Sequence, residues 1–190
     1  MRYLVCLFLA LVLALLQGCF PIIATGVGTG ALMASDRRTA GTYIEDEAIE
    51  LKAIGQISDK YHNTVHVNVT SYNRRALVTG EVPDEATKND ITQIVAGVQN
   101  VKSVNNEMVV SGLSSLSSRG SDTLITSDVK LRFLNNAGKA FHPEHIKVVT
   151  ENGVVFLMGL VYHSEADAAA DIASTTSGVQ RVERVFEYLD

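Results

Sequence analysis

The chain has 190 residues, a formal net charge of −5 and two cysteines. This length suits one medium domain or two small ones. The acidic balance argues against attraction of the whole molecule to nucleic acid, so we expect no nucleic-acid partner. Loss of Cys6 with an N-terminal leader leaves no cysteine pair for an intramolecular disulfide, which excludes a disulfide-stapled scaffold.

The N-terminal segment resembles a bacterial lipoprotein signal. An apolar run of about 13 residues, Leu4–Leu16, is too short for a membrane-crossing helix, which needs about 20, and is typical of a cleaved signal peptide over residues 1–18. It ends in Leu16-Gln17-Gly18-Cys19, an aliphatic and a small residue before cysteine. We therefore predict a lipidated N-terminus at Cys19. By the same resemblance, Phe20 in place of Asp implies the periplasmic face of the outer membrane. A chance cysteine after an ordinary signal and an uncleaved short anchor are the alternatives.

The rest of the chain is an internal duplication at an offset of about 80 residues. Gly97-Val98-Gln99-Asn100-Val101 aligns with Gly178-Val179-Gln180-Arg181-Val182. We predict domains over 44–110 and 122–190. A lipidated cysteine and tether, rich in Gly, Ala and Thr, would precede them over 19–43, and a Ser-rich linker would join them over 111–121.

Each unit is predicted to be an α+β fold of helix, strand, strand, helix and strand. Two helices would cover a small three-stranded mixed sheet. Asp46 and Asp122 are expected near the N-caps of the first helices, and Gly97 and Gly178 at C′ positions with positive φ. Asn152-Gly153 is a strong hairpin signal. The predicted strands are 66–71, 75–82, 146–151 and 154–161, and the predicted second helices are 84–96 and 164–177.

These features resemble the BON domain: a helix opened by Asp-x-x-Ile, a hairpin ending at Gly80 or Gly159, and a closing Gly-Val-Gln-x-Val. The resemblance covers nearly the whole chain. It implies an outer-membrane lipoprotein that binds anionic phospholipids such as phosphatidylglycerol and cardiolipin, supports envelope integrity and acts at the division septum. It also implies the outer-membrane assembly machinery as a candidate partner.

The two first helices differ on the side away from the predicted core. Leu124, Leu131 and Leu134 correspond to Ala48, Gly55 and Ser58, which predicts an extra apolar stripe in the second unit. Such a stripe beside basic residues suits an interfacial helix, and the resemblance implies that this helix contacts the membrane. Packing against the first domain or a protein partner is the alternative. The predicted lipid-binding residues are Leu124, Ser127, Lys130, Leu131, Arg132, Leu134 and Lys139.

No motif predicts a metal, a cofactor or catalysis. His62 and His66 are four residues apart but do not share a predicted helix, and His142 and His145 carry an equally weak signal, so we interpret them as surface histidines. The acidic residues from Glu45 to Glu50 suit a helix start, and no serine has a nucleophile-elbow pattern. We predict a non-enzyme, with a scaffold serving outer-membrane assembly and a hydrolase with a dispersed site as the competing hypotheses.

Overall fold

The structure is a computed structural model that describes residues 36–190, which form one compact unit. The predicted signal peptide, Cys19 and most of the predicted tether lie outside these residues. Among the described helices, none is long and apolar enough to cross a membrane.

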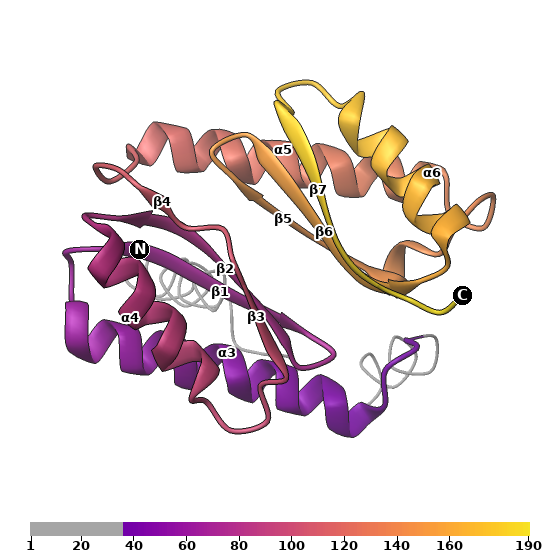
Figure 1. Cartoon of the computed structure of the whole chain (residues 1–190). Helices are drawn as coiled ribbons and strands as arrows, with labels where there is room; N and C mark the ends of the chain where they lie inside the picture. The colour runs from indigo at the N-terminus through magenta and orange to yellow at the C-terminus, as the bar shows by residue number, and fades with distance from the viewer. Residues whose placement is uncertain (1–35) are drawn as a thin grey trace, which may run out of the picture. The chain divides into compact units, whose positions relative to one another are not determined.

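The first half of the unit contains a mixed sheet covered on one face by two helices (Figure 1). Strands β1 and β2 pair in antiparallel fashion, and β3 and β4 both pair in parallel with β2. The elements are α3 (Ala40–Tyr61), β1 (His66–Tyr72), β2 (Arg75–Val82), α4 (Glu85–Ala96), β3 (Ser103–Asn106) and β4 (Val109–Val110).

The second half has the same order of helix, strand, strand, helix and strand, which confirms the predicted α+β duplication. Its sheet has the three strands predicted for each unit, whereas β4 adds a fourth strand to the first sheet. Strands β5 and β6 are antiparallel and β6 and β7 are parallel. The β5–β6 turn has Asn152 and Gly153 at φ 49° and 74°, the left-handed conformation that an Asn-Gly hairpin favours. The elements are α5 (Leu116–Asn135), η1 (Pro143–His145), β5 (Ile146–Glu151), β6 (Val154–Val161), α6 (His163–Ser174) and β7 (Arg181–Tyr188).

Each half has an apolar core between its helices and its sheet, and a third apolar cluster joins the halves. Val78 and Ile91 are fully buried in the first core, and Val129 and Leu157 in the second. The third cluster contains residues of both sheets, Tyr72, Leu77, Phe156 and Met158. Alternate residues of a strand point to opposite faces of a sheet. Each sheet therefore packs against its own helices with one face and against the second sheet with the opposite face.

Both first helices begin earlier than predicted. Thr39 caps α3 by accepting a hydrogen bond from the backbone N–H of Thr42, and Ser115 caps α5 in the same way for Ser118. Residues 40–43 are therefore helix rather than tether, and residues 116–121 are helix rather than linker. Serines in the first turns of α5 are accommodated because a hydroxyl can bond a carbonyl one turn back, as Ser121 does with Ser117.

The ends of the second helices also differ from the prediction. Gly97 caps α4 at φ −78°, so its conformation is not left-handed. Gly178 has the expected positive φ of 84°, but α6 ends earlier, at Ser174. At this end of the helix, where carbonyls lack backbone partners, the Thr175 hydroxyl donates to the Asp171 and Ile172 carbonyls.

An arginine ahead of α3 is bound to the second half. Arg37 donates from Nη1 to the Leu160 carbonyl at 2.8 Å, and its two terminal nitrogens lie 2.6 and 2.8 Å from the carboxylate of Glu165. Glu165 also accepts from the backbone N–H of Tyr162, at the start of α6. This part of the predicted tether is thus held in place.

Replacing Glu165 with Gln should lower the thermal midpoint at pH 7, and the difference from the parent should shrink in acid. Burial opposes ionisation of Glu165, but the hydrogen bonds from Arg37 and Tyr162 outweigh it and lower the pKa of Glu165 below its ordinary 4.5. A carboxyl with a lowered pKa stabilises the fold above its unfolded pKa, and this contribution is lost as pH falls through the folded value. Thermal unfolding between pH 7 and pH 3 checks this, and a pH-independent difference would contradict it.

Candidate functional site

Helix α5 presents an apolar stripe to solvent. Leu124, Leu131 and Leu134 are 68%, 57% and 62% exposed, whereas Val129 and Phe133 of the same helix are buried. The three leucines therefore do not pack against the first domain, and that alternative is wrong for the described unit. Exposed leucines gathered on one helix face mark a surface suited to a partner or a membrane.

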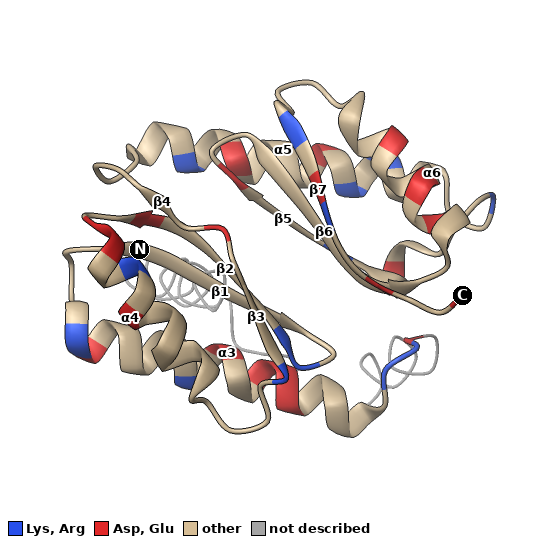
Figure 2. Cartoon of the chain, viewed as in Figure 1, with Lys and Arg blue, Asp and Glu red and all other residues tan. Residues whose placement is uncertain are grey.

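The predicted basic residues do not all flank this stripe. Lys130 and Lys139 are exposed, and Figure 2 shows both basic and acidic segments along α5. Arg132 instead donates to the hydroxyls of Thr176 and Thr175 at 2.7 and 2.9 Å. It ties α5 to the end of α6 with both terminal nitrogens, so Arg132 has a structural role in the described unit, and its lipid contact stays a prediction.

A polar pocket of about 380 Å³ lies along α5. On a helical wheel its α5 residues lie between the buried face and the leucine stripe, so Lys130 and Ser127 border both the pocket and the stripe. Its wall carries four hydroxyl groups and two basic side chains, which are suited to phosphate oxygens, together with two carboxylates. It is lined by Arg119, Asp122, Thr123, Thr126, Ser127 and Lys130 of α5, Thr150 and Glu151 of β5, and His66 and Asn68 of β1.

Arg119 is a pocket residue that the sequence analysis missed, because residues 111–121 were assigned to a linker. Its Nε and one terminal nitrogen donate to the Ser114 hydroxyl and carbonyl at 3.0 and 3.1 Å, which holds the side chain beside the helix start. The signal that could have placed it is Ser115, a favoured N-cap residue four positions earlier. Two basic residues, Arg119 and Lys130, therefore lie on the side of α5 next to the leucine stripe.

Helix α3 has an exposed apolar stripe of its own, which the comparison of Ala48, Gly55 and Ser58 did not reveal. Leu51 is 74% exposed, and Ile44 and Ile54 are also exposed. They occupy different helical positions from the leucines of α5. Exposed Glu47 lies among them, so this stripe includes a carboxylate, whereas the α5 stripe is bordered by Lys130.

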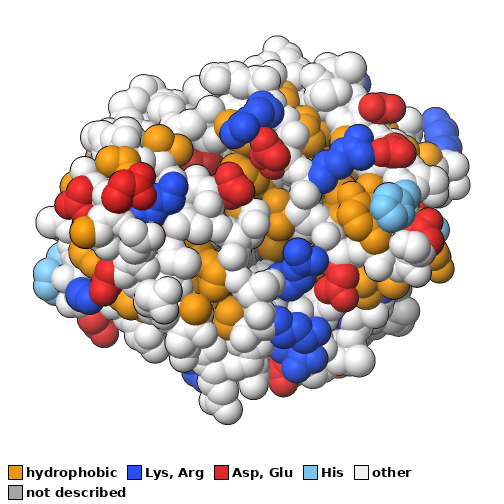
Figure 3. Space-filling model, viewed as in Figure 1, with side chains coloured by type: hydrophobic (Ala, Val, Ile, Leu, Met, Phe, Trp, Pro, Cys, Tyr) orange, Lys and Arg blue, Asp and Glu red, His pale blue; other side chains and the backbone are white. Residues whose placement is uncertain are grey.

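The acidic residues of α3 form structural contacts in the described unit. Glu50 accepts from the Ser71 backbone N–H at 2.7 Å and pairs with Lys147 at 2.6 Å. Arg38 pairs with the buried carboxylate of Asp46. These contacts hold α3 against β1 and join the halves, so the carboxylates have structural partners. On the face drawn in Figure 3, acidic and basic side chains are intermixed with apolar ones, with no surface of a single charge.

Two such αββαβ units in tandem define a dual BON-domain protein. The BON domain family matches residues 45–112 and 121–190, and the chain belongs to this family. It is 41% identical over 178 residues to the outer membrane lipoprotein DolP of Haemophilus influenzae, covering 92% of this chain and 91% of that protein.

Two further relatives are more distant. A 21 kDa hemolysin of Actinobacillus pleuropneumoniae is 31% identical over 81% of this chain and 79% of its own. Osmotically-inducible protein Y of Escherichia coli is 28% identical over 83% of this chain and 80% of its own. None of the three is named as an enzyme.

Proposed function

We propose that this protein is an outer-membrane lipoprotein, anchored at Cys19, that recognises anionic phospholipid through the outer face of α5. The observation that carries the proposal is the exposed leucine stripe beside a hydroxyl-lined pocket that holds Lys130 and Arg119. Leu124 and Leu131 enter the headgroup boundary while the two cations meet phosphate. The similarity to an outer membrane lipoprotein supports the location. Envelope integrity and action at the division site belong to the same proposal.

The magnitudes favour recognition over attachment. Full burial of three leucines contributes roughly 4–9 kcal/mol, and each cation near an anionic surface adds about 1 kcal/mol. Loss of rigid-body freedom offsets at least about 4 kcal/mol of that gain, so α5 alone binds weakly. Acyl chains on Cys19 supply the attachment, and α5 supplies selectivity for lipid composition.

Replacing Leu124 and Leu131 together with Glu should abolish binding to phosphatidylglycerol-containing liposomes and leave the thermal midpoint near that of the parent. The change removes apolar contact and adds two charges that anionic lipid repels. Co-sedimentation of the unlipidated fragment 20–190 measures the effect, with phosphatidylcholine liposomes as the neutral arm. All three apolar clusters lie inside residues 36–190, so this fragment keeps its cores.

The matched control is the double replacement of Leu51 and Ile54 with Glu on α3, which adds the same charge to the other exposed stripe. It should bind like the parent. Equal binding of the parent to neutral liposomes would contradict anionic selectivity. A collapsed midpoint, with binding retained in the folded fraction, would make the α5 stripe structural.

A protein-interaction role is the second candidate, and the stripe on α3 favours it. Ile44, Leu51 and Ile54 are exposed around Glu47, a combination that disfavours an anionic membrane but suits a protein partner, such as a component of outer-membrane assembly. Crosslinking in cells, with a photoreactive residue at Leu51 or at Leu124, separates the candidates. A protein adduct at Leu51 that survives the α5 replacements supports the scaffold role, and adducts to lipid alone at both positions count against it.

A further inference from the structure

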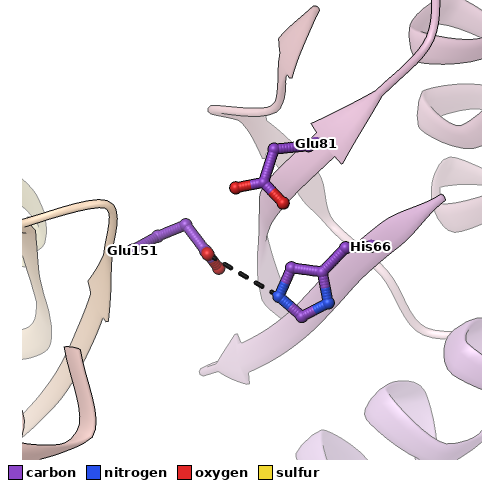
Figure 4. A group of neighbouring side chains, drawn as sticks. All are labelled: His66, Glu81 and Glu151. Carbon is purple, nitrogen blue, oxygen red and sulfur yellow. Dashed lines mark ion pairs between the residues drawn. The ribbon is translucent and has the colours of Figure 1, made fainter. Parts of the chain in front are cut away.

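Three potential metal ligands meet where the two halves join. His66 in β1 and Glu81 in β2 are register partners on neighbouring strands, so their side chains share one face of the first sheet. Glu151, the last residue of β5, reaches them from the second half (Figure 4). One nitrogen of His66 and one oxygen of each carboxylate lie within 4.8 Å of one another, and His66 Nε2 is 3.7 Å from Glu151 Oε1.

Both carboxylates are buried, at 1% exposure for Glu81 and 7% for Glu151. Placing two negative charges together in a protein interior is costly unless a cation accompanies them. A single imidazole is a modest counter-ion for the pair, whereas a divalent cation would balance both charges.

Hydrogen bonds from outside the cluster orient the two carboxylates. Glu151 Oε2 accepts from Asn68 and Thr79 at 3.0 and 3.2 Å, and its other oxygen faces His66. Glu81 accepts from the Asn152 side chain at 2.7 Å and the Ser114 backbone N–H at 3.2 Å. Partners of this kind fix the direction of ligating side chains in metal sites.

The cluster also has an entry route. His66, Asn68 and Glu151 line the pocket along α5, which is open to solvent. A hydrated ion can therefore reach His66 and Glu151 from the pocket, with the ligand oxygen of Glu81 within 4.8 Å of theirs, and a water molecule in the pocket can complete the coordination. One imidazole, two carboxylates and a water form a donor set that suits Zn²⁺, since Mg²⁺ and Ca²⁺ prefer oxygen ligands alone.

We propose that His66, Glu81 and Glu151 bind one divalent transition-metal ion, with Zn²⁺ preferred, and that the ion links the two BON domains. Tetrahedral zinc with bonds near 2.0–2.1 Å places its donors about 3.3 Å apart. On binding, the His66–Glu151 distance of 3.7 Å would therefore shorten by about 0.4 Å, and no donor pair would close by more than about 1.5 Å. The prediction of surface histidines missed this site because it paired His66 with His62, which ends α3, and not with carboxylates that are distant in the sequence.

Calorimetric titration of Zn²⁺ into metal-free fragment 20–190 tests the proposal. The expected result is one site per chain with a dissociation constant in the micromolar range or tighter, and a thermal midpoint that rises with Zn²⁺ and not with Mg²⁺. Replacing His66, Glu81 or Glu151 with Gln should each weaken binding at least tenfold. These exchanges keep the side chains close in size, and the His66 side chain retains 19% exposure, so its variant should unfold cooperatively in EDTA like the parent.

Replacing His142 with Gln is the matched control. His142 and Glu144 form an exposed pair at 3.3 Å, so loss of that histidine should leave Zn²⁺ binding unchanged. No binding by the parent, or the same affinity in the His66 variant, would overturn the proposal. Weakening by the His142 replacement, with the Glu81 and Glu151 variants unaffected, would instead place the ion at an adventitious surface site.

Discussion

Replacing Gly80 with Ala should lower the free energy of unfolding by about 3 kcal/mol or more. Gly80 in β2 has φ +115°, a backbone conformation that residues with a side chain rarely adopt. A Cβ there would lie 2.0 Å from the His66 carbonyl oxygen in the paired strand. Because that atom belongs to the backbone of the sheet, relief of the overlap requires the β1–β2 pairing itself to shift.

Urea unfolding followed by circular dichroism measures this loss, and two other glycines calibrate it. Replacing Gly55 with Ala in α3, where a Cβ meets nothing within 4 Å, should stabilise the protein by about 0.5–1 kcal/mol. Replacing Gly159, the counterpart of Gly80 in the repeat, brings a Cβ 2.5 Å from the His145 carbonyl and should give an intermediate loss. A Gly80 variant within 1 kcal/mol of the parent would contradict the close strand approach.

The four hairpin strands, β1, β2, β5 and β6, were predictable to within one residue because their signals are local. Alternating apolar residues fix which face is buried, and Asn152-Gly153 specifies a hairpin through its own left-handed φ values. Gly80 and Gly159 were recognised as equivalent positions. Their close approach to a neighbouring carbonyl depends on strand pairing, which the sequence pattern does not display.

The candidate sites were less predictable because they depend on contacts between distant segments. The leucines of α5 were found by helical periodicity, whereas Arg119 was missed once its segment was assigned to the linker. Arg132 has the charge expected of a lipid ligand, but the loop after α6 places two threonine hydroxyls within its reach. His66 and Glu151 meet only because the two sheets pack together, and no local pattern encodes that contact.

The acidic residues of the repeat show the same limit. Asp46 and Asp122 suit N-caps, yet each is the seventh residue of its helix. Each receives hydrogen bonds from two consecutive backbone N–H groups of the hairpin turn beside it. The donors are Asn73 and Arg74 for Asp46, and Asn152 and Gly153 for Asp122. The duplicated aspartate thus fastens the first helix to the first hairpin of each domain.

Replacing Asp46 with Ala should therefore lower the free energy of unfolding by about 3–5 kcal/mol, the range for breaking a buried ion pair. Its carboxylate, 2% exposed, accepts four hydrogen bonds of 2.7–2.8 Å, from the two turn N–H groups, the Ser71 hydroxyl and Arg38. Alanine leaves the two turn N–H groups and the Ser71 hydroxyl without this acceptor, and it leaves Arg38 with Asp36 as its remaining carboxylate partner, at 2.7 Å. Asn is a poor substitute, because its amide nitrogen would face donors.

Replacing Asp122 with Ala should cost less, about 1–3 kcal/mol, because only the two turn N–H groups at 2.8 and 2.9 Å lose their acceptor. Urea unfolding compares the free energies of unfolding of the two variants. Amide hydrogen exchange should accelerate at Asn73 and Arg74 in the Asp46 variant, and at Asn152 and Gly153 in the Asp122 variant. The gap between the two losses measures what Arg38 and Ser71 add to the first domain. Equal losses would mean that the turn contacts, which both repeats share, account for the whole effect, and that the buried ion pair of Asp46 contributes nothing net.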